Sequence, residues 1–221
     1  MNVLGLDTAT TLTTVAIASG DGTVHELYDE PAPGSRGQHA ASVLVLAAAV
    51  LERAGVAWEE LDLIAVGVGP GGYTGLRIGL ATAHGLALAH ATALTGVGTL
   101  RALAEPIRGA TALAVIDARR SELFTAAYVD DVEVLAPRVI APAELPGLPA
   151  PNGAVAVGDG ARIYRDALEG AGLAVPEDDS PLHRVSAAAI CRIAVAGGGG
   201  EVSPLYLRRP DAERSLPAGG R

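Results

Sequence analysis

The stretch from Leu61 to Gly79 constrains the fold most, because it combines a buried strand, a glycine-rich turn and the beginning of a helix. Leu61 to Val68 is a short apolar run with β-branched residues, which is typical of an inner strand covered on both faces. Gly69-Pro70-Gly71-Gly72 ends this strand, and Thr74 is the expected N-cap of the helix that follows. An inner strand that leads into a helix predicts an α/β protein.

Within that helix, Gly75, Gly79 and Ala83 recur every four residues and form a smooth strip on one face. Each glycine costs about 1 kcal/mol relative to alanine, so we expect a close backbone contact to offset this cost. Phosphate binding at the helix N-terminus is the alternative. A P-loop needs Lys-Ser/Thr after its last glycine, whereas this segment has Leu76-Arg77 and the chain has no lysine. Packing is therefore favoured, and anion binding stays open.

Composition and charge narrow the class of protein. The 221 residues carry a net charge of −9, and all 16 basic residues are scattered arginines, which disfavours a tight, direct grip on nucleic acid. The single cysteine, Cys191, lies in an apolar helical pattern and is expected in the core. No secretory signal is recognisable at the N-terminus, and the apolar run 40–51 is too short to span a membrane. We expect a soluble, cytoplasmic protein without a membrane segment.

The beginning of the chain predicts three antiparallel strands and then a helix. The strands are expected at Val3–Thr8, Leu12–Ser19 and Thr23–Tyr28, and the helix at Gln38–Ala54, where Gly55 stops it.

The helix at Gln38–Ala54 has two apolar stripes. Ala40, Leu44, Ala47 and Leu51 form one stripe, and Val43, Leu46 and Val50 form another about a quarter-turn away. One stripe can cover the sheet. The second needs cover from the helix Thr74–His90, from a partner protein or from both, because an exposed apolar patch of this kind usually marks an interface.

The second half of the chain repeats the pattern of the first. Strands are expected at Thr111–Ile116 and Glu122–Val129, and Asp130-Asp131 is expected to turn the chain into a third strand. A proline-rich surface passage follows, and then a strand at Ala154–Val157. Helices are expected at Ala161–Ala171 and Ser186–Ala196. Two βββαβα units therefore predict two lobes, residues 1–104 and 105–221.

Asp7 and Asp117 fall at matching points, since each closes the first strand of its half. Such a carboxylate could face a phosphate or a metal ion, or it could accept hydrogen bonds from the amides of its own turn. Neither turn contains a glycine, so a phosphate has little room to approach, and we favour the turn role for Asp7. An ATP-dependent phosphotransferase that uses Asp7 and Asp117 around Mg²⁺ is the alternative function.

Other catalytic constellations are not recognisable. Histidines that share a metal on one helix are spaced by three or four residues, whereas His84 and His90 are six apart, and we expect both, like His39, to serve packing or the surface. The motifs of serine, cysteine and zinc peptidases do not occur, so a peptidase is the least favoured function. The sequence predicts no metal and no cofactor.

Several motifs together resemble one family. They are Leu4-Gly-Leu-Asp-Thr-Ala-Thr10 with Val15-Ala-Ile17, Gly69-Pro-Gly-Gly-Tyr-Thr-Gly-Leu-Arg-Ile-Gly79, Ile116-Asp-Ala-Arg119 with Glu122, and Pro204-Leu-Tyr-Leu-Arg208. On these motifs the chain resembles the bacterial TsaB (YeaZ) proteins of tRNA threonylcarbamoyladenosine biosynthesis. The central motif is the most specific, although Ser-Phe commonly stands in the family where this chain has Gly72-Tyr73.

The resemblance implies a fold and partners. The fold would be the two-lobed actin-like ATPase fold, also called ASKHA or ribonuclease H-like. The partners would be TsaD, the paralogue that transfers the threonylcarbamoyl group to adenosine 37 of tRNA, and the small ATPase TsaE. In TsaD the metal-binding histidines follow a Gly-Val pair, whereas no histidine follows Gly96-Val97 here. TsaB-like proteins are regarded as scaffolds that contact tRNA only indirectly and pair with themselves when alone.

Our hypothesis is therefore a non-catalytic subunit that docks on TsaD through the helices Gln38–Ala54 and Thr74–His90, with a homodimer through the same helices as a further expectation. The interface residues that we predict are Val43, Leu46, Val50, Gly75, Gly79 and Ala83.

Overall fold

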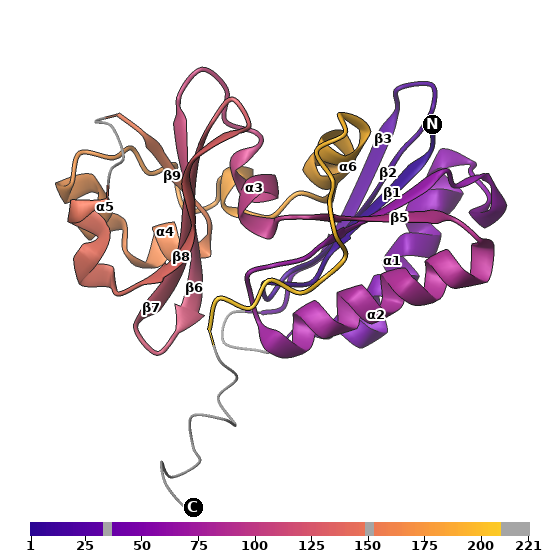
Figure 1. Ribbon diagram of the computed structural model, residues 1–221, viewed down its shortest axis with the longest axis horizontal. Helices are drawn as coiled ribbons and strands as arrows, with labels where there is room; N and C mark the ends of the chain where they lie inside the picture. Colours follow the sequence, from indigo (N-terminus) through magenta and orange to yellow (C-terminus); the bar gives the residue numbers. More distant parts are fainter. Residues whose placement is uncertain (33–36, 149–152, 209–221) are drawn as a thin grey trace, which may run out of the picture.

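The computed structural model describes residues 1–32, 37–148 and 153–208. It contains two lobes, each built around one β-sheet that has helices on both of its faces (Figure 1). The predicted loop residues 33–36, and Pro149 and Pro151 of the proline-rich passage, lie outside the described residues. Among the residues that the structure describes, no helix is both long and apolar enough to cross a membrane.

The first lobe has a five-stranded sheet in the order β3-β2-β1-β4-β5. Its strands are β1 (Val3–Asp7), β2 (Thr13–Ala18), β3 (Val24–Asp29), β4 (Leu63–Gly67) and β5 (Ala93–Val97). The first three strands are antiparallel, whereas β1, β4 and β5 run parallel, as expected where a helix connects two strands. The helices α1 (His39–Ala54) and α2 (Tyr73–His90) cover one face, and α6 (Ala187–Val195) covers the other (Figure 1).

The second lobe repeats this topology. Its four strands are β6 (Thr111–Arg119), β7 (Glu122–Val129), β8 (Val132–Ile140) and β9 (Val155–Val157), in the order β8-β7-β6-β9. The order matches that of β3-β2-β1-β4, which confirms the predicted duplication. The helix α3 (Thr99–Ala104) packs on β6 and β7. The short helices α4 (Asp159–Ile163) and α5 (Arg165–Gly170) follow β9, and the 3₁₀ helices η1 (Trp58–Glu60), η2 (Pro142–Gly147) and η3 (Pro181–His183) lie in connections.

Three local predictions need correction. Thr74 does not cap α2, because the helix begins one residue earlier and its N-cap is Gly72, whose N–H donates to the carbonyl of Ala9 at 2.6 Å. The single helix predicted at 161–171 is two helices, since Tyr164 has non-helical dihedral angles between α4 and α5. The counterpart of α1 in the second lobe is only the 3₁₀ helix η2, where Pro146 removes a backbone donor.

The glycine strip of α2 packs against the turn that follows β1. A Cβ atom added at Gly71 would overlap the carbonyl oxygen of Ala9, and one added at Gly75 would overlap that of Thr8. At Gly79 the atom would meet the Thr8 hydroxyl, which donates a hydrogen bond of 2.7 Å to the carbonyl of Gly75. The packing interpretation of these glycines is therefore confirmed, and the surface that they contact belongs to the same chain.

Helix α6 links the two lobes, although residues 105–221 contain it. It packs on β1 and β2 of the first lobe, and Cys191 lies fully buried there, with its thiol 3.3 Å from the carbonyl oxygen of Val3. This confirms Cys191 as a core residue, and its burial raises the pKa of the thiol to about 12. A carboxylate from β3 caps the helix, because Glu26 accepts hydrogen bonds from Ser186 Oγ and from the N–H of Ala188, both at 3.1 Å.

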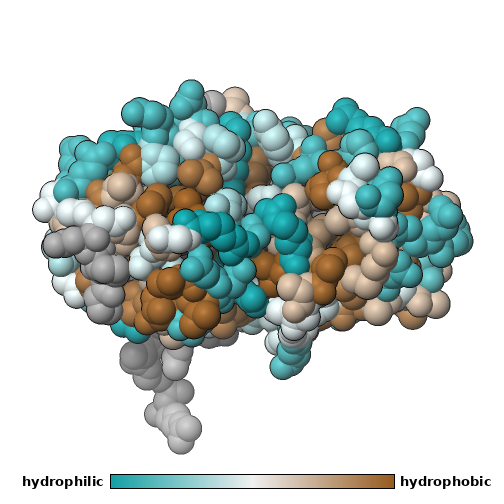
Figure 2. Space-filling view, turned by 90° about the horizontal axis from the view of Figure 1, so that it is seen from above, coloured by the Kyte–Doolittle hydropathy of each residue, from teal (hydrophilic) through white to brown (hydrophobic). Residues whose placement is uncertain are grey.

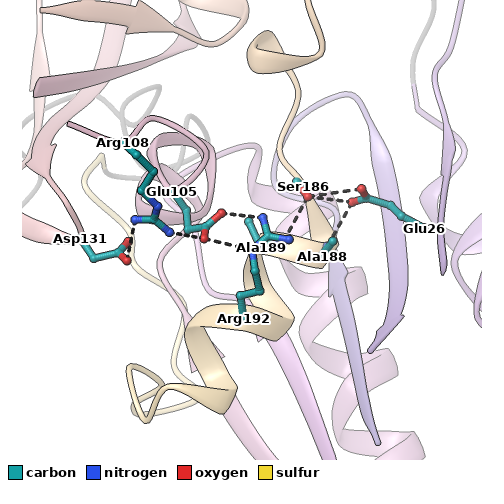
Figure 3. Close-up of polar contacts among 8 residues, drawn as sticks. All are labelled: Glu26, Glu105, Arg108, Asp131, Ser186, Ala188, Ala189 and Arg192. Carbon is teal, nitrogen blue, oxygen red and sulfur yellow. Dashed lines mark hydrogen bonds and ion pairs between the residues drawn. The ribbon is translucent and has the colours of Figure 1, made fainter. Parts of the chain in front are cut away.

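A buried carboxylate joins α6 to the second lobe (Figure 3). Glu105, whose side chain is 3% exposed, accepts from Arg192 of α6 at 2.6 and 3.0 Å and also pairs with Arg108. Arg108 in turn contacts Asp131 at 2.9 Å, between β7 and β8. Hydrophilic residues gather along the middle of the molecule on the face seen from above (Figure 2). Polar contacts thus contribute to holding the lobes together.

Replacing Gly75 with alanine tests whether the close approach of α2 is required. We expect Gly75→Ala to lower the free energy of unfolding by about 1–3 kcal/mol, because the new methyl group overlaps a main-chain oxygen. The matched control is Gly85→Ala in the same helix, where an added Cβ meets nothing within 4 Å. That variant should gain up to about 1 kcal/mol from helix propensity. Urea unfolding measures both, and equal effects would contradict the assigned contact.

Candidate functional site

A cavity of about 460 Å³ lies between the two lobes. Both lobes supply polar groups to its wall, and so does the chain near its described end. The polar side chains that line it are Thr10, Thr11, His39, Tyr73, Thr74, Asp117, Arg119, Asp159, Tyr206 and Arg208. A concave site with several polar groups from different segments is the usual position of a ligand site in a two-lobed protein.

Asp7 is a buried turn carboxylate and does not line this cavity. Its Oδ1 accepts from the N–H of Ala9 at 2.7 Å, and its Oδ2 accepts from the hydroxyl of Thr99 at 2.7 Å. An added Cβ at Gly67 would overlap the same carboxylate, so the glycine at the end of β4 makes room for it. Burial raises the pKa of Asp7 to about 6 against the lowering effect of these two hydrogen bonds. The turn role predicted for Asp7 is confirmed.

Asp117 makes the same kind of turn in the second lobe, but it faces the cavity. Its Oδ1 accepts from the N–H of Arg119 at 2.8 Å, and its Oδ2 lies 3.2 Å from the guanidinium of that residue. Its own N–H donates to Asp159 at 3.0 Å. Burial raises the pKa of Asp159 against the lowering effect of the hydrogen bond from the Asp117 N–H. Both first-strand carboxylates therefore bond the amide two residues ahead, and only one of them also reaches the cavity.

The histidines do not form a shared site. His39 lies at the cavity wall, where its Nδ1 is 2.9 Å from the Thr13 hydroxyl, and burial lowers its pKa. His84 is exposed on α2, whereas His90 stacks on Trp58 at 5.4 Å between ring centroids. Within residues 1–32, 37–148 and 153–208, no group of three or more His, Cys, Asp or Glu side chains could hold a metal ion.

Most of the interface residues predicted from sequence lie inside the first lobe. Leu46 is half-buried. The other five are buried: Val43, Val50, Gly75, Gly79 and Ala83. The second apolar stripe of α1 thus covers its own sheet, and a charged residue there would unfold the protein and leave a docking test uninterpretable. An interface on these helices has to use other side chains.

The exposed side of α1 is apolar as well, which the sequence reasoning missed, whereas α2 adds Leu88 beside the exposed Arg77 and His84. On α1, Leu44 and Val45 are 49% and 66% exposed, and on α2 Leu88 is 86% exposed. Exposed alanines lie at positions 41, 48 and 81. Leu44 belongs to the same predicted stripe as Ala47 and Leu51, which are buried, yet its own side chain is exposed. The signal that could have found the correct face is the i, i+3, i+4, i+7 pattern of residues 41, 44, 45 and 48. We call the exposed residues Ala41, Leu44, Val45, Ala48, Ala81 and Leu88 the outer helix surface.

Comparisons with known proteins assign a family to this arrangement. The family model described as TsaD, tRNA N6-adenosine threonylcarbamoyltransferase, matches residues 33–178. The tRNA threonylcarbamoyladenosine biosynthesis protein TsaB of Escherichia coli is 38% identical over 135 residues, 59% of this chain and 56% of that protein. The solved structure of YeaZ from Pseudomonas aeruginosa superposes with a TM-score of 0.75 at 29% identity and covers 93% of this chain and 99% of its own.

The chain belongs to the TsaB (YeaZ) family. The uncharacterized protein ML0378 of Mycobacterium leprae is 35% identical over 215 residues, and the chain spans 56% of the length of that relative. A hexokinase of the ROK family from Thermus thermophilus shares the fold, with a TM-score of 0.51 at 14% identity over 90% of this chain. This TsaB-family chain therefore has the expected two-lobed fold of the actin-like ATPases.

The buried carboxyl of Asp7 predicts a pH dependence of stability. Its pKa is about 6 in the folded protein and 3.8 in the unfolded chain, so the folded state binds the proton more tightly. The stabilisation from this proton is fully present below pH 3.8 and is lost as the pH rises through 6. Between pH 4 and pH 7 we expect Asp7 to lower the free energy of unfolding by roughly 2 kcal/mol.

Asp7→Asn removes this titrating group and keeps its shape. Urea unfolding at several pH values should show a flatter profile for Asp7→Asn than for the unmodified protein. The control Asp166→Asn, on an exposed position of α5, should leave the profile unchanged. A profile that stays the same in Asp7→Asn would contradict the raised pKa.

Proposed function

We propose that this protein is a subunit of the machinery that makes N6-threonylcarbamoyladenosine in tRNA, and that it docks on a TsaD-type threonylcarbamoyltransferase without catalysing a step itself. Membership of the TsaB family supports the pathway, since the matched Escherichia coli protein is named for this biosynthesis. The outer helix surface is the observation that carries the docking role.

The outer helix surface has the composition of a protein interface. Leu44, Val45 and Leu88 expose apolar side chains on two neighbouring helices, and small residues lie between them. Isolated exposed apolar residues are common on soluble proteins, but the apolar row on α1, with Leu88 on the neighbouring helix, favours a partner. An added Cβ at Gly85 would meet nothing in this chain, so a helix of the partner can approach α2 closely there. A second copy would use the same surface when TsaD is absent.

The state of the first-strand carboxylates supports a non-catalytic role. Both oxygens of Asp7 are engaged by Ala9 and Thr99 in the interior, so the carboxylate has no free side towards the cavity. A phosphotransferase of this fold needs a carboxylate that can reach a metal-bound phosphate. The same proposal includes contacts with TsaE. It also includes only an indirect relation to tRNA, because a net charge of −9 disfavours direct tRNA binding.

An ATP-dependent phosphotransferase is the second candidate, and one observation favours it. The cavity between the lobes is large enough for a small ligand, and Asp117 and Asp159 both line it. Asp117 and Asp159 would have to serve the metal ion, since Asp7 is sealed in the turn.

Charged substitutions on the outer helix surface test the docking role. We expect Val45→Asp and Leu88→Asp each to weaken the binding of a TsaD-type partner at least about tenfold in Kd, because a buried, unpaired carboxylate would lie in the interface. Co-elution and biolayer interferometry measure the binding, and circular dichroism checks the fold. Val132→Asp is the control, since Val132 is 65% exposed in the other lobe. Unchanged binding of both helix variants would refute the surface.

Calorimetry with ATP and Mg²⁺ distinguishes the two candidate functions. Titration of the isolated protein should give no measurable heat of binding if the chain is a non-catalytic subunit. A saturable heat that disappears in Asp117→Asn would instead support the phosphotransferase.

A further inference from the structure

We propose that residues 204–208 form a releasable strap that holds the two lobes at a fixed separation across the cavity, with Tyr206 as its latch. The segment follows Gly200, which pairs with Gly96 at the edge of β5 through hydrogen bonds of 2.9 and 3.0 Å. From there the chain runs without helix or strand to the second lobe (Figure 1). Four strap residues, 205–208, line the cavity.

The first half of the strap is attached to the first lobe. The N–H of Leu205 donates to the carbonyl of Val68, just after β4, at 2.8 Å. The ring of Tyr206 stacks on Tyr73 of α2 with 5.2 Å between centroids, and its hydroxyl accepts from Arg77 Nε at 3.1 Å. The Arg77 guanidinium also lies 4.0 Å from the centre of the Tyr73 ring. These three side chains form the latch.

The last residue of the strap is attached to the second lobe. Leu207 packs against a hydrophobic cluster that contains residues of both lobes. Arg208 donates to the carbonyl of Ala118 at 2.8 Å and pairs with Glu122 at 3.0 Å, both at the tip of the β6–β7 hairpin. Tyr206 and Arg208, two residues apart in one extended segment, are therefore fixed to opposite sides of the cavity, so a change in the width of the cavity must break one set of contacts.

The latch is the set that can break. Tyr73 and Tyr206 are 38% and 39% exposed, and exposed cation–π and hydrogen-bonded contacts stabilise weakly. Another connection between the lobes, Glu105 with Arg192, is built on a carboxylate that is 3% exposed and lies away from the strap, where α3 meets α6 (Figure 1). The α3–α6 junction thus acts as the hinge and the strap as the brace.

Distance measurements between spin labels test the strap. The labels are placed on Ala81→Cys in α2 and Ser121→Cys in the β6–β7 hairpin of the full-length chain, and the buried Cys191 stays unlabelled. Tyr206→Ala should broaden the distance distribution and move its mean to longer distances. Arg77→Gln, which removes the guanidinium and with it one latch hydrogen bond, should give a smaller shift in the same direction.

The control is Val132→Ala, which removes a side chain that is 65% exposed on β8 of the second lobe and does not line the cavity. This variant should leave the distances unchanged. Hydrogen exchange of the Leu205 amide gives a second readout and should accelerate in Tyr206→Ala and Arg77→Gln. The proposal is overturned if the distance distribution and the Leu205 exchange rate in Tyr206→Ala match those of the unmodified protein.

Discussion

The close backbone contact between α2 and the turn after β1 determines the geometry of the first lobe. Gly71 and Gly75 leave room for the carbonyl groups of Thr8 and Ala9, and the Gly72 N–H bonds directly to one of them. The turn cannot shift without disturbing α2, so it fixes the first residues of β2 and one side of the cavity. The same closeness seals Asp7 behind the turn, where an amide and a hydroxyl occupy its oxygens. Tight packing has thus replaced the open space that a phosphate would need.

The lobes depend on each other because the chain crosses between them more than once. Helix α6 comes from the end of the second half, yet it closes the open face of the first sheet, where Glu26 caps it. Glu105 then ties this helix to α3 and the second sheet. Burial of β1 and β2 on both faces therefore requires residues from the far end of the sequence. For this reason, neither half has a complete core without segments of the other.

Regular patterns in the sequence predicted the fold well. The site could be predicted only in part, because it depends on contacts between segments that are distant in the sequence. The buried run that became β4, the three opening strands and the glycine after α1 each carry a local physical signal, and so does the repeat of Asp7 and Asp117. The face of α1 could not be settled in this way, because both of its sides are apolar and only the position of the sheet decides which one is buried. Tyr73 and Arg77 are one helical turn apart on α2, but Tyr206 lies 129 residues beyond Arg77, and no spacing in the sequence indicates that it joins them.

The two kinds of exposed surface on this molecule differ in chemistry, and this difference separates their roles. The cavity wall combines hydroxyls, carboxylates and arginines, most of which already bond to neighbours in the same chain, such as Arg119 with Asp117 and Arg208 with Glu122. A ligand there would have to compete with these internal pairs. Val45 and Leu88 on the outer helix surface are apolar and exposed, so a partner that covers them displaces water without breaking a hydrogen bond or an ion pair of these side chains. This contrast supports the proposed binding of another protein to the helices over binding of a charged small molecule between the lobes.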